Sequence, residues 1–118
     1  MARLEIDRVS KAYGESHAVA DVTLDVADGE FLVLLGPSGC GKTTTLRMVA
    51  GFVEPTAGLI RLGGRDVTDL PPWKRNAGLV FQSYALFPHL TVAENVAFGL
   101  EMRKVPKAVI EPKVAEAL

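Results

Sequence analysis

Eight residues from Gly36 to Thr43, GPSGCGKT, match the spacing G-x-x-x-x-G-K-[ST]. The backbone N–H groups of such a loop can surround a phosphate, and its glycines permit the positive φ angles and close approach that this requires. Lys42 supplies a full positive charge for the β- and γ-phosphates, and the Thr43 hydroxyl can bind Mg²⁺. Because an apolar segment precedes the loop and a helical pattern follows it, we interpret it as a phosphate-binding loop rather than an ordinary turn.

The loop also contains the only cysteine of the chain, Cys40. A single cysteine excludes an intrachain disulfide, which fits a reducing compartment. A redox or metal role is conceivable, but one sulfur without Cys or His beside it makes a poor metal site. We therefore expect the thiol of Cys40 to have no role of its own.

The residues around the loop predict the elements that position it. Alternating apolar residues over 4–9 and 22–26 predict strands of an antiparallel region. The segment FLVLL, residues 31–35, is apolar on both faces, as a buried parallel strand would be. Residues 42–51 predict a helix that ends at Gly51. These elements indicate an α/β fold.

Further elements are predicted downstream of the helix. Residues 59–67 indicate a short hairpin with Gly63-Gly64 in its turn, and residues 78–81 another apolar strand. Thr91 is expected to cap a helix, with Glu94 at the capping-box position. The final residues are expected to begin another helix with Pro112 at its first position.

Composition excludes several classes of function. The chain has 118 residues, 48% of them hydrophobic and 23% charged, with a net charge of −1. This balance gives no basic field for nucleic acid. No apolar run approaches the roughly 20 residues that span a bilayer, so we expect no direct membrane insertion. A membrane would enter only through a partner.

Three segments narrow the class of nucleotide-binding protein. The guanine-recognition tetrapeptide of GTPases, Asn/Thr-Lys-x-Asp, does not occur, whereas the loop alone leaves a small-molecule kinase open. Together, SKAYG (10–14), LLGPSGCGKTTTLRMVAGFVEPTAG (34–58) and VFQSYALFPHLTVAENVAFGL (80–100) closely resemble the ATP-binding subunits of ABC transporters. Within that family they are most similar to importer subunits of the maltose and polyamine type.

The resemblance implies a P-loop NTPase fold with an antiparallel β subdomain, truncated at the start of the helical subdomain. Residues 1–118 would be the N-terminal part of an ABC-type nucleotide-binding domain. They would divide into an antiparallel β region (1–30), a P-loop core (31–82), and the Q-loop with the start of the helical subdomain (83–118).

The resemblance also assigns residue roles, with ATP and Mg²⁺ as cofactors. Tyr13 would stack on adenine, although a structural tyrosine on an edge strand is the alternative from sequence alone. Gln82 would be the Q-loop glutamine that contacts Mg²⁺ and the attacking water, where spacing alone favours a solvated amide. Lys42 and Gln82 are then the catalytic residues, and Thr43 and Gln82 the metal ligands. The expected nucleotide-binding residues are Tyr13, Gly36, Pro37, Ser38, Gly39, Cys40, Gly41, Lys42, Thr43 and Thr44.

The implied partners are transmembrane permease subunits and a second nucleotide-binding subunit, which would complete a dimer. The chain would then lie in the cytoplasm, peripheral on the inner face of the cell membrane. Neither His17 nor His89 receives a role. The expected permease contact, whose alternative is core packing, comprises Tyr84, Leu86, Phe87 and Pro88.

Other motifs of the family do not occur in these 118 residues. Neither Asp66 nor Asp69 ends an apolar strand as a Walker B aspartate does, and the pair Gly63-Gly64 is not part of an LSGGQ signature. A switch histidine is also absent. We therefore expect the N-terminal portion of an importer ATPase that drives solute uptake, inactive by itself. The alternatives are a short nucleotide-binding module that never hydrolyses and a P-loop small-molecule kinase.

Overall fold

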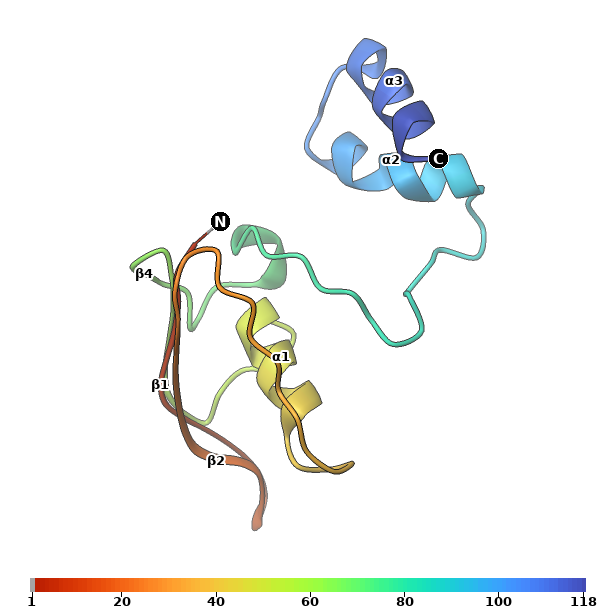
Figure 1. Ribbon diagram of the computed structural model, residues 1–118. Helices are drawn as coiled ribbons and strands as arrows, with labels where there is room; N and C mark the ends of the chain where they lie inside the picture. The colour runs from red at the N-terminus through yellow and green to blue at the C-terminus, as the bar shows by residue number, and fades with distance from the viewer. Residues whose placement is uncertain (1) are drawn as a thin grey trace. The chain divides into compact units, whose positions relative to one another are not determined.

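The computed structural model describes residues 2–118, which form two compact units, one ending at Leu79 and one beginning at Val80 (Figure 1). The second unit consists of α2 (Val92–Met102), α3 (Lys107–Ala117) and the loop before them. The first unit contains β1 (Leu4–Tyr13), β2 (Ser16–Val26), α1 (Lys42–Ala50), β3 (Ala57–Leu62), β4 (Arg65–Asp66) and a 3-10 turn, η1 (Pro72–Lys74). No helix among residues 2–118 is long and apolar enough to cross a membrane.

The strands of the first unit form one antiparallel sheet in the order β2-β1-β3-β4. The predicted antiparallel region and the hairpin around Gly63-Gly64 are therefore confirmed. In the sheet, Ile6 pairs with Leu24 on one side and with Ile60 on the other. Helix α1 lies against the sheet (Figure 1). Its Met48 side chain is fully buried in the core between them. The core consists of Ile6, Val9, Val19, Met48, Ile60 and Val67.

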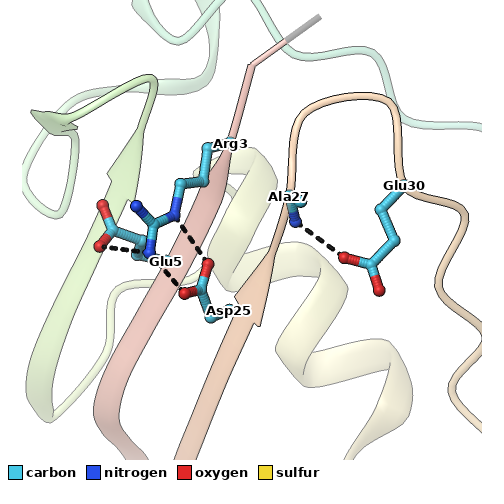
Figure 2. Close-up of polar contacts among 5 residues, drawn as sticks. All are labelled: Arg3, Glu5, Asp25, Ala27 and Glu30. Carbon is cyan, nitrogen blue, oxygen red and sulfur yellow. Dashed lines mark hydrogen bonds and ion pairs between the residues drawn. The ribbon is translucent and has the colours of Figure 1, made fainter.

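Polar contacts hold the end of the β1–β2 pair (Figure 2). Arg3 donates from Nε and Nη2 to the two carboxylate oxygens of Asp25, at 2.8 and 2.5 Å, and its Nη2 lies 3.7 Å from Glu5. These hydrogen bonds lower the pKa of Asp25. Their contribution is therefore complete above the unfolded-state pKa, about 3.9, and is lost as pH falls through the lowered value. Because the side chains are exposed, that contribution is small.

The chain turns after β2 before it enters the glycine-rich loop. A carboxylate oxygen of Glu30 accepts the backbone N–H of Ala27 at 2.8 Å (Figure 2), and the Glu30 N–H donates to the Ala27 carbonyl at 3.0 Å. Residues 28–29 thus form a turn.

Two predicted strands are wrong. Residues 31–35 and 78–81 have no strand structure, and Phe31 and Leu35 are 90% and 89% exposed. A parallel strand depends on neighbouring strands to pair its backbone groups. Among residues 2–118 the only sheet is the antiparallel one, and it does not extend to either segment. Apolar composition alone was therefore not sufficient to form a strand.

The helices agree with their predicted boundaries in two of three cases. Helix α1 ends at Gly51 as predicted, and α2 begins with the predicted capping box, in which Thr91 and Glu94 exchange hydrogen bonds of 2.9 and 3.1 Å. The position of Pro112 was predicted incorrectly, because α3 begins at Lys107 and contains Pro112 in its interior. The buried side chain of Ile110 lies in the first turn of α3, so packing extends the helix N-terminally despite the hydrogen bond that proline removes.

Arg75 connects α1 to the segment after β4. Its side chain is 6% exposed. Nη1 donates to the carbonyl oxygens of Met48 and Val49 at 2.7 and 3.1 Å, Nε to Leu70 at 2.8 Å, and Nη2 to Thr68 at 3.0 Å. Burial lowers the pKa of Arg75, but a guanidinium remains charged in proteins. Met48 and Val49 belong to the last turn of α1, where carbonyls lack intrahelical partners and positive charge is favourable.

Gly51 allows this close approach of the guanidinium. Its φ of 93° is the left-handed conformation that ends many helices, and its N–H donates to the Arg47 carbonyl at 2.9 Å. A Cβ atom at Gly51 would lie 2.7 Å from Nε of Arg75. The glycine that ends α1 therefore also leaves space for the arginine.

We predict that Arg75→Met lowers the free energy of unfolding by about 3 kcal/mol or more, because buried carbonyls lose their donors. Urea denaturation of the variant measures this change. The matched control is Arg65→Met, which removes an exposed arginine of β4 and is expected to change stability by less than about 0.5 kcal/mol. Equal unfolding free energies for the two variants would contradict the anchoring role.

Candidate functional site

The glycine-rich loop leads directly into the N-terminus of α1. Gly41 occupies the N-cap position, and the first residue of the helix is Lys42. No side chain caps this end, and the first turn contains no acidic residue. The first N–H groups of a helix lack intrahelical partners and carry the positive end of the helix dipole. The N-terminus of α1 therefore has the donors and the charge that suit a phosphate group.

The loop packs closely against β2. Gly41 has a φ of 94°, and a Cβ atom there would lie 2.6 Å from the Ala18 carbonyl oxygen and 3.1 Å from a methyl group of Val19. Gly39 also has a positive φ, of 81°, but no atom lies within 4 Å of where its Cβ would be. Both glycines provide conformational freedom, whereas only Gly41 is also required for close packing.

The ammonium group of Lys42 lies over its own loop. It donates to the carbonyl oxygen of Gly36 and, at 3.4 Å, to that of Pro37. These acceptors are neutral, so an anionic phosphate oxygen would make a stronger charge-assisted hydrogen bond with the same ammonium. Lys42 is thus held against the glycine-rich loop, at the first position of α1.

The three threonines after Lys42 have different environments. Thr43 is exposed and Thr44 half-buried, so their hydroxyls are accessible to a ligand. Thr45 is buried, and its hydroxyl donates to the Gly41 carbonyl at 2.8 Å. Thr45 therefore fixes the helix start rather than binding a ligand. This role was missed in the sequence, although the spacing of residues 45, 48 and 49 already places them on one helix face.

The remaining loop residues are exposed. Cys40 donates its backbone N–H to the Pro37 carbonyl at 3.3 Å, and its thiol is free. No group of three or more potential metal-ligating side chains occurs within residues 2–118. Ser38 lies at the outer turn of the loop. The loop as a whole is accessible from solvent.

Tyr13 is the last residue of β1 and is 57% exposed. It pairs with Ser16 across the β1–β2 turn. The contact between Gly41 and Ala18 joins this hairpin to the glycine-rich loop. The first unit therefore brings the hairpin that carries Tyr13 and the loop with Lys42 into one packed assembly.

Gln82 lies in the second unit, in the loop before α2, and is exposed. The Tyr84 N–H closes a turn onto the Phe81 carbonyl at 3.0 Å, and Tyr84 and Ala85 both have positive φ angles. Tyr84 and Leu86 are 74% and 70% exposed, whereas Phe87 packs on the ring of Phe98 at 4.6 Å. The predicted permease contact is thus exposed except for part of Phe87.

Asn95 organises this loop from the first turns of α2. Its side-chain oxygen accepts the Phe87 N–H at 2.9 Å. Its amide nitrogen donates to the carbonyl oxygens of Phe87, Leu90 and Thr91, at 3.3, 3.2 and 2.9 Å. No periodic pattern of residues points to Asn95, because its hydrogen bonds go to backbone groups at the end of the preceding loop and the start of α2.

The chain is similar in sequence to known proteins. A family model described as "ABC transporter" matches residues 19–117. The spermidine/putrescine import ATP-binding protein PotA of Thermobifida fusca is 58% identical over 119 residues, covering 98% of this chain and 31% of the relative. The protein of the same name from Acidothermus cellulolyticus is 61% identical over 114 residues, covering 93% of this chain and 30% of the relative. The chain therefore spans about a third of the length of these curated relatives.

Solved structures support the same fold. The ATP-binding cassette MJ0796, solved as a dimer in a post-hydrolysis state with ADP and Pi, is 30% identical with a TM-score of 0.85. The match covers 96% of this chain and 54% of the cassette. The predicted α/β P-loop NTPase fold is thereby confirmed, even though two of its strands are not formed here.

The packing of the loop on β2 can be tested with two alanine variants. Gly39→Ala is expected to cost about 1 kcal/mol of unfolding free energy, because its φ is positive but its surroundings are open. Gly41→Ala is expected to cost at least about 1 kcal/mol more, because its Cβ would also meet the Ala18 carbonyl. Chemical denaturation of both variants measures the difference, and equal losses would argue against the contact.

Proposed function

Since the chain belongs to the ABC transporter family, whose model matches residues 19–117, we propose that it forms the nucleotide-binding part of an importer ATPase. The observation that carries this proposal is the glycine-rich loop joined to an uncapped helix N-terminus, with Lys42 held over it. ATP hydrolysis would drive solute uptake through membrane subunits. The names of the curated relatives support a polyamine such as spermidine or putrescine as the solute.

The donor groups of the first unit fit a Mg-nucleotide. The loop N–H groups and Lys42 would bind the β- and γ-phosphates, and Ser38 would lie near the γ-phosphate. Thr44 would donate to the α-phosphate, while the exposed hydroxyl of Thr43 would be a Mg²⁺ ligand. Bound Mg²⁺ would neutralise charge that develops on the phosphate oxygens. The ADP and Pi bound to the related cassette support a nucleotide at this loop.

We assign the reacting end of the nucleotide to Lys42 and Gln82, with Gln82 orienting the attacking water and contacting Mg²⁺. The exposed amide of Gln82 is free to take such a role. Tyr13 would stack on adenine, which its exposed ring and the packing of its hairpin on the loop support. The proposed division remains an antiparallel β region (1–30), a P-loop core (31–82) and a Q-loop segment (83–118).

We further propose that the exposed loop before α2 contacts a transmembrane permease. Its side chains Tyr84 and Leu86 are apolar and largely exposed, which suits a protein partner. A second nucleotide-binding subunit would complete the assembly, as the dimeric form of the related cassette supports. The protein would then act in the cytoplasm, at the inner face of the cell membrane. The contact comprises Tyr84, Leu86, Phe87 and Pro88.

Residues 1–118 by themselves are expected to hydrolyse ATP negligibly. Family members polarise the attacking water with a carboxylate after the Walker B aspartate, and a signature loop from a second subunit completes the site. Neither motif occurs in this sequence. Binding the ground state without stabilising the transition state does not accelerate the reaction. Phosphate release by residues 1–118, abolished in Lys42→Ala, would contradict this proposal and indicate a carboxylate that acts within them.

The phosphate site is tested directly by Lys42→Ala. Removing a charge that faces polyphosphate is expected to weaken ATP binding by about tenfold to a hundredfold, since charge-assisted hydrogen bonds contribute roughly 1.5–3 kcal/mol. Calorimetric titration of the full-length protein measures the dissociation constant. Equal constants for the parent and the variant would contradict the assignment of the loop.

The adenine site is tested by Tyr13→Ala and Tyr13→Trp. Stacking on a base contributes roughly 1–3 kcal/mol, so alanine is expected to weaken a non-hydrolysable ATP analogue by about fivefold to a hundredfold. Inorganic triphosphate, which has no base, should bind equally to both variants and the parent, and tryptophan should retain analogue binding. A loss shared equally by the two ligands would make Tyr13 a structural residue.

A further inference from the structure

Lys11 lies against the ring that we assign to adenine. Its ammonium nitrogen is 5.1 Å from the centroid of the Tyr13 ring. The two residues are two positions apart on β1, so their side chains project from the same face of the strand. Within residues 2–118, no carboxylate forms an ion pair with Lys11. The tyrosine ring is therefore the contact that the structure gives to this charge.

A cation over an aromatic face is attracted by the ring quadrupole when it lies within about 6 Å of the centroid. This attraction restricts rotation of the Tyr13 side chain, which is 57% exposed. It also occupies one face of the ring, which leaves only the opposite face for a stacked base. An aromatic side chain that is already ordered loses less entropy when a ligand binds.

The hairpin connects this pair to the phosphate site. Lys11 pairs with Val19 of β2. Gly41 of the loop lies so close to Ala18 and Val19 that a Cβ atom on it would touch both residues. The strand position that holds Lys11 is therefore next to the strand position that supports the loop. A base stacked on Tyr13 and phosphates in the loop would be held by the same strand pair.

We propose that Lys11 is a positioning residue for adenine nucleotides, which orders the Tyr13 ring and reserves one of its faces for the base. The inference rests on the proposed function, because it takes Tyr13 as the adenine platform. It predicts an effect on the base and none on the phosphates. A lysine that served only to attract phosphate would affect both kinds of ligand, and a lysine that only packed on the strand would affect neither.

The experiment uses the full-length protein and two ligands, a non-hydrolysable ATP analogue and inorganic triphosphate, each measured by calorimetric titration with Mg²⁺. Lys11→Met removes the charge but keeps nearly the length of the side chain. It should weaken binding of the ATP analogue about twofold to fivefold without changing the affinity for triphosphate. Lys11→Arg should retain analogue affinity, because arginine also stacks on aromatic rings. Lys74→Met, in η1, is the matched control for the loss of charge and should leave the affinity for both ligands unchanged.

A double-mutant cycle assigns the effect to the pair. In a Tyr13→Ala background, Lys11→Met should cause no further loss of analogue affinity. If Tyr13→Ala loses affinity for the analogue but not for triphosphate, and Lys11→Met loses affinity for neither, this inference is overturned while the adenine assignment stands. An equal loss of both ligands in Lys11→Met would overturn it in favour of phosphate attraction. If Tyr13→Ala weakens both ligands equally, the adenine assignment itself fails, and this inference fails with it.

Discussion

A buried guanidinium determines the arrangement of the first unit. Arg75 satisfies the last carbonyls of α1 and two carbonyls of the segment after β4, so one side chain joins that segment to a helix end that includes Met48, 27 residues before Arg75. A buried charge is costly unless hydrogen bonds surround it, and here the guanidinium donates four hydrogen bonds to backbone oxygens. The C-terminal end of α1 is therefore fixed independently of the residues at its other end.

The opposite end of α1 is fixed by close packing rather than by charge. Gly41 lies against Ala18 and Val19 of β2, and Thr45 holds the first turn through the Gly41 carbonyl. With both ends constrained, the donors at the helix N-terminus keep one direction, as the proposed binding of phosphate would require. Lys42 remains the adaptable element, since its bonds go only to neutral carbonyls of its own loop.

The second unit uses a side-chain amide for a comparable purpose. Asn95 provides hydrogen-bond partners for backbone groups of Phe87 and Leu90, in the last residues of the loop before α2. Two adjacent residues with positive φ, Tyr84 and Ala85, are held in that loop. Such conformations cost energy in non-glycine residues and occur frequently at functional sites. The exposed side chains of Tyr84 and Leu86 in this loop are consistent with the proposed protein contact.

The sequence by itself determined the features that depend on local chemistry. The glycine-rich sequence of the loop, the helix that begins at Lys42 and is capped by Gly51, and the Thr91 capping box all follow from residues within a few positions of one another. Tertiary structure decided what depends on distant partners. Residues 31–35 have the composition of a strand but no neighbour to pair with, while the roles of Arg75 and Asn95 arise from backbone groups that only folding brings to them. Every residue carries a backbone carbonyl, whatever its side chain. The identity of an accepting residue therefore does not show that a distant side chain such as Arg75 will bind it.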